Sequence, residues 1–294
     1  MTITVFTPTF NRATLLPRLY ESLVNQTFLD FEWLIVDDGS TDDTFNFIES
    51  IKENDKIDIQ YYYQNNAGKH AAINWGVELA KGDLFFIVDS DEVMIESGLQ
   101  TIVDVYKQVS DNDNFAGVTG LKSFFSGKTI GGELNYTYLD CSAIDYNLKY
   151  KYGGEMAVAY RTKILQKYPF PIFEGEKYVG LNYKYLLCDQ EYELLVMDEI
   201  LCNVEYQADG SSANMFRQYL NNPKGFAFLR TVYMKYDKTF KRKFMNCIHY
   251  VSSSIISKNK KFLKESPEKG LTILAIPFGI ALTVYIKQQV KKMN

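Results

Sequence analysis

Asp89 and Asp91 stand two residues apart in "VDSDE", directly after the apolar run "LFFI". Like charges at the end of a buried strand repel each other unless a cation or strong hydrogen-bond donors compensate them. Mg²⁺ and Mn²⁺ prefer carboxylate oxygens, and they commonly bind through one or two carboxylates together with a substrate phosphate. The pair therefore predicts a divalent metal site that serves a phosphorylated ligand.

Three other polar clusters also follow apolar runs in the first seventy residues. Alone, the second is an ordinary turn that caps a helix, and Lys69 in the third is an ordinary solvated charge. All of them follow an apolar run, so they are interpreted together as residues at the ends of strands. The clusters are "TPTFNR" (7–12), "VDDGSTDDT" (36–44) and "QNNAGKH" (64–70).

The elements that must position these clusters alternate in type along the chain. Strands followed by helices predict a parallel sheet covered on both faces, with ligands bound outside the carboxyl ends of the strands. The four clusters then share one edge and form one site. Strands are expected at 3–8, 32–39, 57–64 and 83–91, and helices at 12–26, 41–54 and 67–82.

In order and spacing, the four motifs resemble those of family 2 glycosyltransferases with the GT-A fold, over residues 1–210. The resemblance implies an α/β fold with a Rossmann-like, mostly parallel sheet flanked by helices. It implies inverting transfer of a sugar from a nucleotide-diphosphate donor, with Mn²⁺ or Mg²⁺ as cofactor. Segments 153–180 and 204–215 resemble the acceptor side of bacterial members that build surface polysaccharides.

The resemblance also implies residue roles. Asp38 matches the position that accepts a hydrogen bond from uracil or thymine N3–H, which favours UDP- or dTDP-sugars. Asp91 matches the metal ligand, whose ion would stabilise the leaving diphosphate as a Lewis acid. The donor-binding residues implied are Thr7, Pro8, Arg12, Asp38, Gly68, Lys69, Asp89 and Ser90.

An inverting transfer needs a general base for the acceptor hydroxyl. Relatives carry a glutamate where this chain has Leu181, which cannot take a proton. Glu176, Glu174 and Glu155 are the nearby candidates, and Glu176 is preferred because it lies inside the matched motif "GEKY". Glu155 is otherwise assigned to the acceptor side. The alternative for Glu176 is a structural carboxylate that pairs with Lys177 or caps a turn.

The net charge of −4 hides an asymmetry, because residues 1–216 carry −17 and residues 217–294 carry +13. We therefore expect a catalytic domain at 1–210, with the donor half at 1–95 and the acceptor half at 96–210. A basic helical region then occupies 211–294.

Within that region, residues 271–286 contain no charge. As a helix this segment reaches about 24 Å, short of a hydrocarbon core about 30 Å thick, and we expect Pro277 and Gly279 to interrupt it. The +13 balance favours an in-plane or re-entrant anchor on an anionic membrane. The alternative is a buried helix that covers the catalytic domain.

The N-terminal residues "MTITVFTPTFNR" lack the zones of a signal peptide, and the four cysteines form no C-x-x-C pair. We expect a cytoplasmic enzyme, peripheral on the inner face of the cytoplasmic membrane, with a glycan or lipid-linked acceptor. His70 is a weak candidate for a nucleotide contact, and His249 is interpreted as structural.

Three alternative functions remain. Leu181 favours a nucleotide-sugar-binding pseudoenzyme. A dinucleotide-dependent oxidoreductase is disfavoured because no G-x-G-x-x-G follows the first strand. Nucleic-acid binding by the basic region is disfavoured by the apolar segment 271–286.

Overall fold

The computed structural model describes residues 1–294 except 54–55, 132–137, 142–153, 206, 208–213 and 294. By their internal contacts the residues group into two compact units. The first comprises Met1–Pro169 and Lys184–Gln207, and the second comprises Phe170–Tyr183 and Ala208–Asn294. Segment 170–183, which the sequence places on the acceptor side of the catalytic domain, thus groups with the C-terminal helices.

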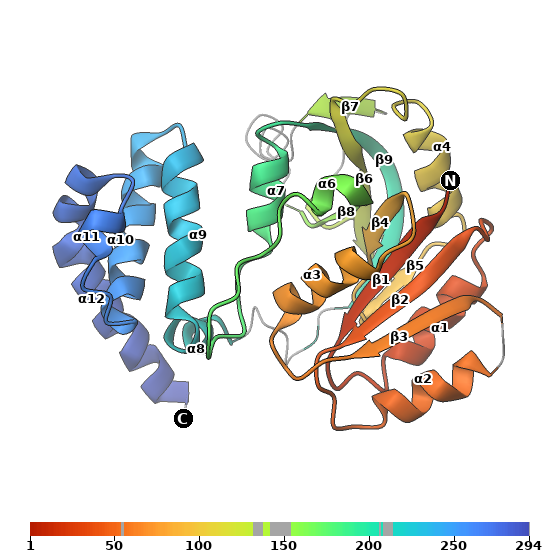
Figure 1. Ribbon diagram of the computed structural model, residues 1–294, viewed down its shortest axis with the longest axis horizontal. Helices are drawn as coiled ribbons and strands as arrows, with labels where there is room; N and C mark the ends of the chain where they lie inside the picture. Colours follow the sequence, from red (N-terminus) through yellow and green to blue (C-terminus); the bar gives the residue numbers. More distant parts are fainter. Residues whose placement is uncertain (54–55, 132–137, 142–153, 206, 208–213, 294) are drawn as a thin grey trace. The chain divides into compact units, whose positions relative to one another are not determined.

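The first unit is built on one mixed sheet with the order β3-β2-β1-β4-β8-β6-β9-β5, in which β7 also pairs with β9 (Figure 1). Strands β1 to β4 run parallel, as expected. Beyond β4 the sheet is mixed. Strand β8 is antiparallel to both β4 and β6, whereas β6 and β9 are parallel. The strands are β1 Ile3–Thr9, β2 Phe31–Asp37, β3 Asp58–Tyr63, β4 Leu84–Ile87, β5 Glu92–Met94, β6 Phe115–Phe124, β7 Tyr138–Cys141, β8 Met156–Arg161 and β9 Glu193–Val204.

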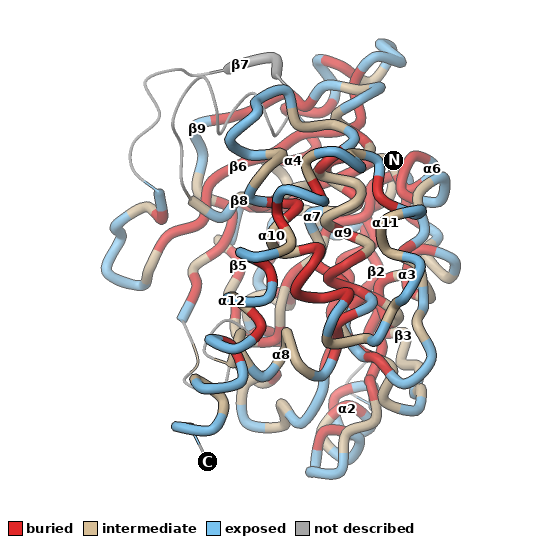
Figure 2. The backbone as a smooth tube through the Cα atoms, turned by 90° about the vertical axis from the view of Figure 1, so that its left-hand side faces the viewer, coloured by how far each residue is buried: buried red, intermediate tan, exposed pale blue. Residues whose placement is uncertain are grey.

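Helices cover both faces of this sheet because side chains alternate along its central strands. In β1, Ile3 and Val5 join the core formed with α1, α2 and α4. Phe6 points to the opposite face, where Gly76 of α3 approaches so closely that a Cβ there would lie 2.1 Å from the Phe6 ring. Figure 2 shows the resulting burial of the strands. The helices of this unit are α1 Leu16–Val24, α2 Thr44–Lys52, α3 Lys69–Leu79, α4 Gly98–Tyr106, α6 Thr162–Leu165 and, from Lys184 on, α7 Asn182–Cys188.

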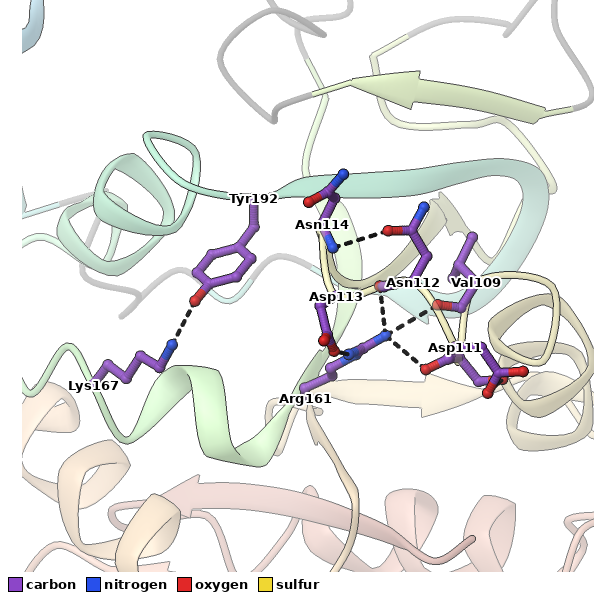
Figure 3. Close-up of polar contacts among 9 residues, drawn as sticks. Val109, Asp111, Asn112, Asp113, Asn114, Arg161, Lys167 and Tyr192 are labelled. Atoms are coloured by element: carbon purple, nitrogen blue, oxygen red, sulfur yellow. Dashed lines mark hydrogen bonds and ion pairs between the residues drawn. The ribbon is translucent and has the colours of Figure 1, made fainter.

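Arg161, at the end of β8, fastens the loop between α4 and β6 (Figure 3). Its guanidinium Nη2 donates hydrogen bonds to the carbonyl oxygens of Val109, Ser110 and Asn112 at 2.9 to 3.0 Å. Nη1 lies 3.3 Å from a carboxylate oxygen of Asp113. This clamp fixes the start of β6, the strand that delivers a buried cation to the site described below.

The second unit is helical, as the sequence predicts. Pro223 stands in the first turn of α9, where its missing N–H leaves no hydrogen bond unmade. Helix α10 packs against both α9 and α12 around Cys247, Tyr250 and Val251. The helices are α8 Met215–Asn221, α9 Pro223–Tyr236, α10 Phe240–Ile256, α11 Phe262–Glu265 and α12 Lys269–Met293.

The expectation that Pro277 and Gly279 interrupt the apolar segment was wrong, because α12 is one helix of 25 residues with Pro277 inside it. Proline removes one N–H donor, whereas the packing against α10 is continuous on both sides of it. A Cβ on Gly279 would lie 2.4 Å from Val251 Cγ1, so the glycine permits this close approach. At about 1.5 Å per residue the helix is roughly 38 Å long. Its length and composition would allow it to cross a membrane, although helices in soluble cores can meet the same test.

Candidate active site

The loops that follow β1 and β2 are bonded to each other. The Asn11 backbone N–H donates to Ser40 Oγ at 2.8 Å, and Asn11 Oδ1 accepts from the Thr41 N–H at 2.8 Å. The backbone N–H of Arg12 donates to Thr44 Oγ1 at 3.2 Å. Arg12 is thereby held at the carboxyl ends of the strands. Its positive charge is a minor contribution to the lowered pKa of Asp89, and it only partly offsets the burial that raises the pKa of Asp91.

Thr7 and Pro8 are buried within β1. The Thr7 hydroxyl accepts a hydrogen bond from Trp33 Nε1 at 3.0 Å, and the residue is 0% exposed. The side chain of Thr7 therefore serves the core. Its predicted nucleotide contact, which stays a prediction, would have to use the backbone.

The Asp38 carboxylate ties the β2 end to the loop before α3. Oδ1 accepts from Gln64 Nε2 and from the Ala67 N–H, both at 2.7 Å, and Oδ2 accepts from the Gly68 N–H at 2.8 Å. A carboxylate offers about four acceptor positions, so Oδ2 retains room for one more donor. The predicted contact with a base N3–H is therefore compatible with the site, and Asp38 has a structural role as well.

Two glycines allow the loops to close around this carboxylate. Gly39 has φ +89°, and a Cβ there would lie 2.9 Å from the Asn66 backbone nitrogen. Gly68 has φ +95° and directly precedes α3. Both conformations favour glycine over residues with a side chain. Gly68 thus sets the direction of Lys69, the first residue of α3.

Lys69 reaches the Asp-Ser-Asp turn. Its Nζ lies 2.6 Å from both carboxylate oxygens of Asp89. Burial alone would raise the pKa of Asp89, but the cations of Lys69 and Lys122 hold it below the usual value. Ser90, between the two aspartates, is 7% exposed, and its contact with the donor stays a prediction.

Asp91 is in a different electrostatic situation. Burial and the neighbouring Asp89 charge raise its pKa. Among the described residues, no other side chain donates a hydrogen bond to its carboxylate, and no cluster of three or more His, Cys, Asp or Glu groups could hold a metal ion. A divalent ion here would need oxygens from a bound diphosphate, which is how Mg²⁺ and Mn²⁺ commonly bind. The residues present therefore fit the predicted metal.

A buried ion pair next to the Asp89-Ser90-Asp91 turn was not predicted from the sequence. Glu92 of β5 is 2% exposed and pairs with Lys122 of β6, which is 9% exposed. The other Glu92 oxygen lies 3.4 Å from the Asp89 backbone nitrogen, which donates to it. Burial alone would lower the pKa of Lys122, but Glu92 and Asp89 raise it. A lysine inside the apolar strand "FAGVTGLKSF" was the available signal, but nothing in the sequence named its partner.

The two histidines are both driven towards the neutral form. His70, in the first turn of α3, is buried, and burial lowers its pKa while Asp38 opposes this. Burial lowers the pKa of His249 to about 4, and its ring lies 6.0 Å from that of Tyr219. These surroundings agree with a structural interpretation of His249.

Glu176 makes the structural contacts that were the alternative to catalysis. Its Oε1 accepts from the Lys224 N–H at 2.9 Å, and its Oε2 accepts from the Gly225 N–H at 2.8 Å. The carboxylate thus satisfies two donors in the first turn of α9, where the helix dipole favours a negative charge. Its role as general base stays a prediction. Glu155 is exposed immediately before β8, and Glu174 is also exposed.

Known proteins resemble this chain in sequence. The sequence model described as "Glycosyl transferase family 2" matches residues 4–147. The GalNAc(5)-diNAcBac-PP-undecaprenol beta-1,3-glucosyltransferase of Campylobacter jejuni is 26% identical over 290 residues, which cover 92% of this chain and 88% of that protein. Glycosyltransferase GlyG of Streptococcus pneumoniae is 32% identical over 111 residues, 38% of this chain and 36% of that protein.

Solved structures share the fold. S. aureus TarS 1-349 in complex with UDP-GlcNAc superposes with a TM-score of 0.61 at 18% identity, covering 94% of this chain and 79% of that one. The mannosyltransferase PcManGT from Pyrobaculum calidifontis, in complex with GDP-Man and Mn²⁺, gives 0.54 at 17% identity, covering 95% and 73%. With its four strand-end motifs, its matched domain and a relative aligned along most of its length, the chain belongs to the family 2 glycosyltransferases and has their GT-A fold.

Proposed function

We propose that the protein transfers a sugar, with inversion, from a UDP- or dTDP-linked donor to a glycan or lipid-linked acceptor in surface polysaccharide synthesis. The observation that carries this proposal is the rim at the ends of β1 to β4. There the Asp91 carboxylate has a raised pKa, whereas its neighbour Asp89 is already paired with Lys69. Such a rim suits a diphosphate bound together with one divalent cation.

The residues have distinct roles in this proposal. Asp91 would hold Mn²⁺ or Mg²⁺, which when bound supplies Lewis-acid stabilisation of the leaving diphosphate. Arg12 and Lys69 bring positive charge to the same edge, where it favours a diphosphate. Asp38 would accept the base N3–H at its remaining Oδ2 position. Asp89, kept ionised by Lys69, would accept hydrogen bonds from ribose or donor-sugar hydroxyls.

Glu176 is the proposed general base, and Glu155 is proposed to contact the acceptor. Each Glu176 oxygen accepts one backbone hydrogen bond, so a lone pair remains on each for an acceptor hydroxyl. Removing the proton from that hydroxyl would leave Glu176 neutral at the start of α9. A neutral Glu176 would lose the favourable interaction of its charge with the two N–H donors of α9, which is the physical argument against this assignment.

The proposed acceptor follows from the Campylobacter relative, whose name describes a glycan linked through a diphosphate to undecaprenol. A similar acceptor would require the enzyme at the inner face of the cytoplasmic membrane, in contact with anionic lipid. The +13 charge of residues 217–294 supports this location.

The test is thermal unfolding with a panel of nucleotide-sugars, with and without Mn²⁺. A ligand that binds only the folded protein raises its melting temperature. We expect a UDP- or dTDP-sugar to do so in a metal-dependent way, and we expect Asp91→Asn to lose the metal-dependent part while it keeps the ligand-free melting temperature. Asp104→Asn, an exposed change on α4, is the matched control. Full metal-dependent binding and transfer by the Asp91 variant would refute the proposal.

A nucleotide-sugar-binding protein without transfer is the second candidate. Two observations favour it, namely Leu181 at the usual position of the base and the helix-capping contacts of Glu176. Metal-dependent donor binding with no hydrolysis of the donor and no transfer to membrane extracts would support this candidate.

A further inference from the structure

Helix α12 has its side chains arranged opposite to those of an ordinary surface helix. Its buried residues are Thr272, Ala275, Gly279, Thr283 and Ile286, most of them small or polar. Six of its large apolar residues are instead 49% to 62% exposed, whereas Leu271, Ile276 and Leu282 are half-buried. The six exposed residues are Ile273, Leu274, Phe278, Ile280, Val284 and Tyr285. At about 100° per residue the two sets are centred on opposite sides of the helix. A helix on the surface of a soluble domain buries its large apolar side chains instead.

The inward face packs in a way that suits helices in lipid. Thr283 Oγ1 lies 2.9 Å from Ser252 Oγ of α10, and Gly279 leaves no space for a Cβ beside Val251. Thr272 Oγ1 lies 3.7 Å from Cys247 Sγ of α10, and it also bonds locally to Ser266 Oγ in the turn before the helix. Small residues and hydroxyl hydrogen bonds are typical of helix contacts within membranes. In water, this face would recover little of the apolar area that the outward face leaves exposed.

Positive charge borders the outward face without interrupting it. Residues 270–286 contain no charged side chain, whereas Lys269 precedes them and Lys287, Lys291 and Lys292 follow. Exposed Lys241 and Arg242 lie at the start of α10. Lysine and arginine at the edges of an apolar face are placed to meet anionic headgroups.

We propose that α12 lies in the plane of an anionic bilayer, with the outward face (Ile273, Leu274, Phe278, Ile280, Val284 and Tyr285) in the acyl boundary. This inference rests on the proposed function, because a lipid-linked acceptor supplies the reason for such a surface. An in-plane position agrees with the packing of α10 along the opposite side of the helix. Spanning would surround the helix with lipid and would also bring its packed neighbour α10, which begins with exposed Lys241 and Arg242, into the bilayer. A second copy is disfavoured because it would juxtapose two segments of charge +13.

Flotation of the full-length protein with vesicles tests the surface. The vesicles contain phosphatidylcholine alone or a 3:1 mixture with phosphatidylglycerol, at low and at high salt. The variant Leu274→Glu with Phe278→Glu changes exposed residues, so the packed face of α12 remains intact. Leu29→Glu with Phe45→Glu is the matched control, because both residues are exposed apolar side chains of the first unit.

We expect the partition coefficient of the α12 variant for anionic vesicles to be at least tenfold lower than that of the unchanged protein. The control variant is expected to bind like the unchanged protein. Salt would weaken this binding without abolishing it, since the apolar contact is not screened. Metal-dependent melting with the nucleotide-sugar would stay the same in both variants. If the unchanged protein shows no metal-dependent rise in melting temperature with any nucleotide-sugar, that result would count against the proposed function and not against the membrane surface. Equal partitioning of both variants, or no binding to anionic vesicles, would overturn the inference.

Two further measurements distinguish the in-plane arrangement from the alternatives. Nitroxide depth tests whether the helix spans the membrane, and sedimentation tests whether a second copy covers this face. Nitroxides on Ile273→Cys, Ile280→Cys and Tyr285→Cys are expected at one shallow depth. A spanning helix would place position 280 far deeper than the other two and would overturn the in-plane arrangement. Sedimentation that shows a dimer dispersed by the α12 variant, together with no vesicle binding, would assign the face to a second copy and would also overturn it.

Discussion

Lys69 Nζ lies 2.6 Å from each carboxylate oxygen of Asp89 and so joins the first residue of α3 to the turn after β4. This contact distinguishes two carboxylates that look equivalent in the sequence. Asp89 is held by a protein cation, with Glu92 and Lys122 buried below it. Asp91 accepts no side-chain hydrogen bond from the described part of the chain, and burial together with the Asp89 charge raises its pKa. If a divalent ion binds here as proposed, the ammonium would direct it to Asp91 rather than to Asp89.

Removing this ammonium is expected to have opposite effects on two ligands. Lys69→Met would lower the affinity for the nucleotide-sugar by about tenfold, because a charge-assisted contact is lost at the diphosphate edge. It would raise the affinity for Mn²⁺ in the absence of nucleotide, since Asp89 and Asp91 could then bind the ion together. Isothermal titration calorimetry measures both affinities. Lys107→Met, which breaks an exposed ion pair on α4, is the control. Parallel losses of both affinities would contradict this division of roles.

Asp38→Ala is expected to weaken UDP binding by about 1–3 kcal/mol, the cost of leaving polar groups unpaired. Because Asp38 also accepts from the Ala67 and Gly68 N–H groups, the free energy of unfolding would fall by a similar amount. Titration with UDP and GDP separates the two contributions. A base-specific contact predicts a larger loss for UDP. Equal losses would mean that Asp38 acts only by holding the loop, and unchanged affinity for UDP and dTDP alike would remove it from the donor site.

Glu176→Gln tests helix capping against catalysis. An amide has one acceptor oxygen and would place NH₂ against one of the two backbone donors of α9. The free energy of unfolding would then fall by about 1–2 kcal/mol. Glu174→Gln, an exposed change two residues away, would leave it unaltered. If Glu176 is also the base, kcat would fall by about 10² to 10⁴ and the acidic limb of the pH profile would disappear. An unchanged kcat would assign this carboxylate to structure alone.

His249 is expected to make stability depend on pH. Its pKa is about 4 in the folded protein, and an unperturbed histidine titrates near 6.5, so the unfolded chain binds more protons between these values. The contribution is present in full above about pH 6.5 and declines as the pH falls towards 4, by about 2 kcal/mol at pH 5.

Thermal or urea unfolding at pH 7.5 and pH 5 measures this dependence. His249→Phe keeps a ring beside Tyr219 and cannot take a proton, so its stability would change less between the two pH values. Part of the dependence would remain, because burial also lowers the pKa of His70. A variant with the same pH dependence as the unchanged protein would contradict the expectation.

Strands β1 to β4, helices α1 to α3 and the polar clusters at the strand ends were predictable from the sequence because their signals are local. Apolar runs fixed β1 to β4, and the polar residues directly after them had to meet at one edge of a parallel sheet. Gly39 and Gly68 also stand where the loops require positive φ. These features depend on neighbours along the chain, and the family's motifs record the same neighbours.

What only the tertiary structure decided depends on which distant segments meet. Glu92 and Lys122 pair because β5 and β6 flank the same strand, β9, and strand order beyond β4 leaves no local signal. Glu176 received its two donors from α9, nearly fifty residues away in the sequence. For α12, the composition showed that the segment is apolar, but it did not show which residues lie on which face of the helix. Only packing against α10 decided that small and hydroxyl residues such as Gly279 and Thr283 face inward while six large apolar residues face outward.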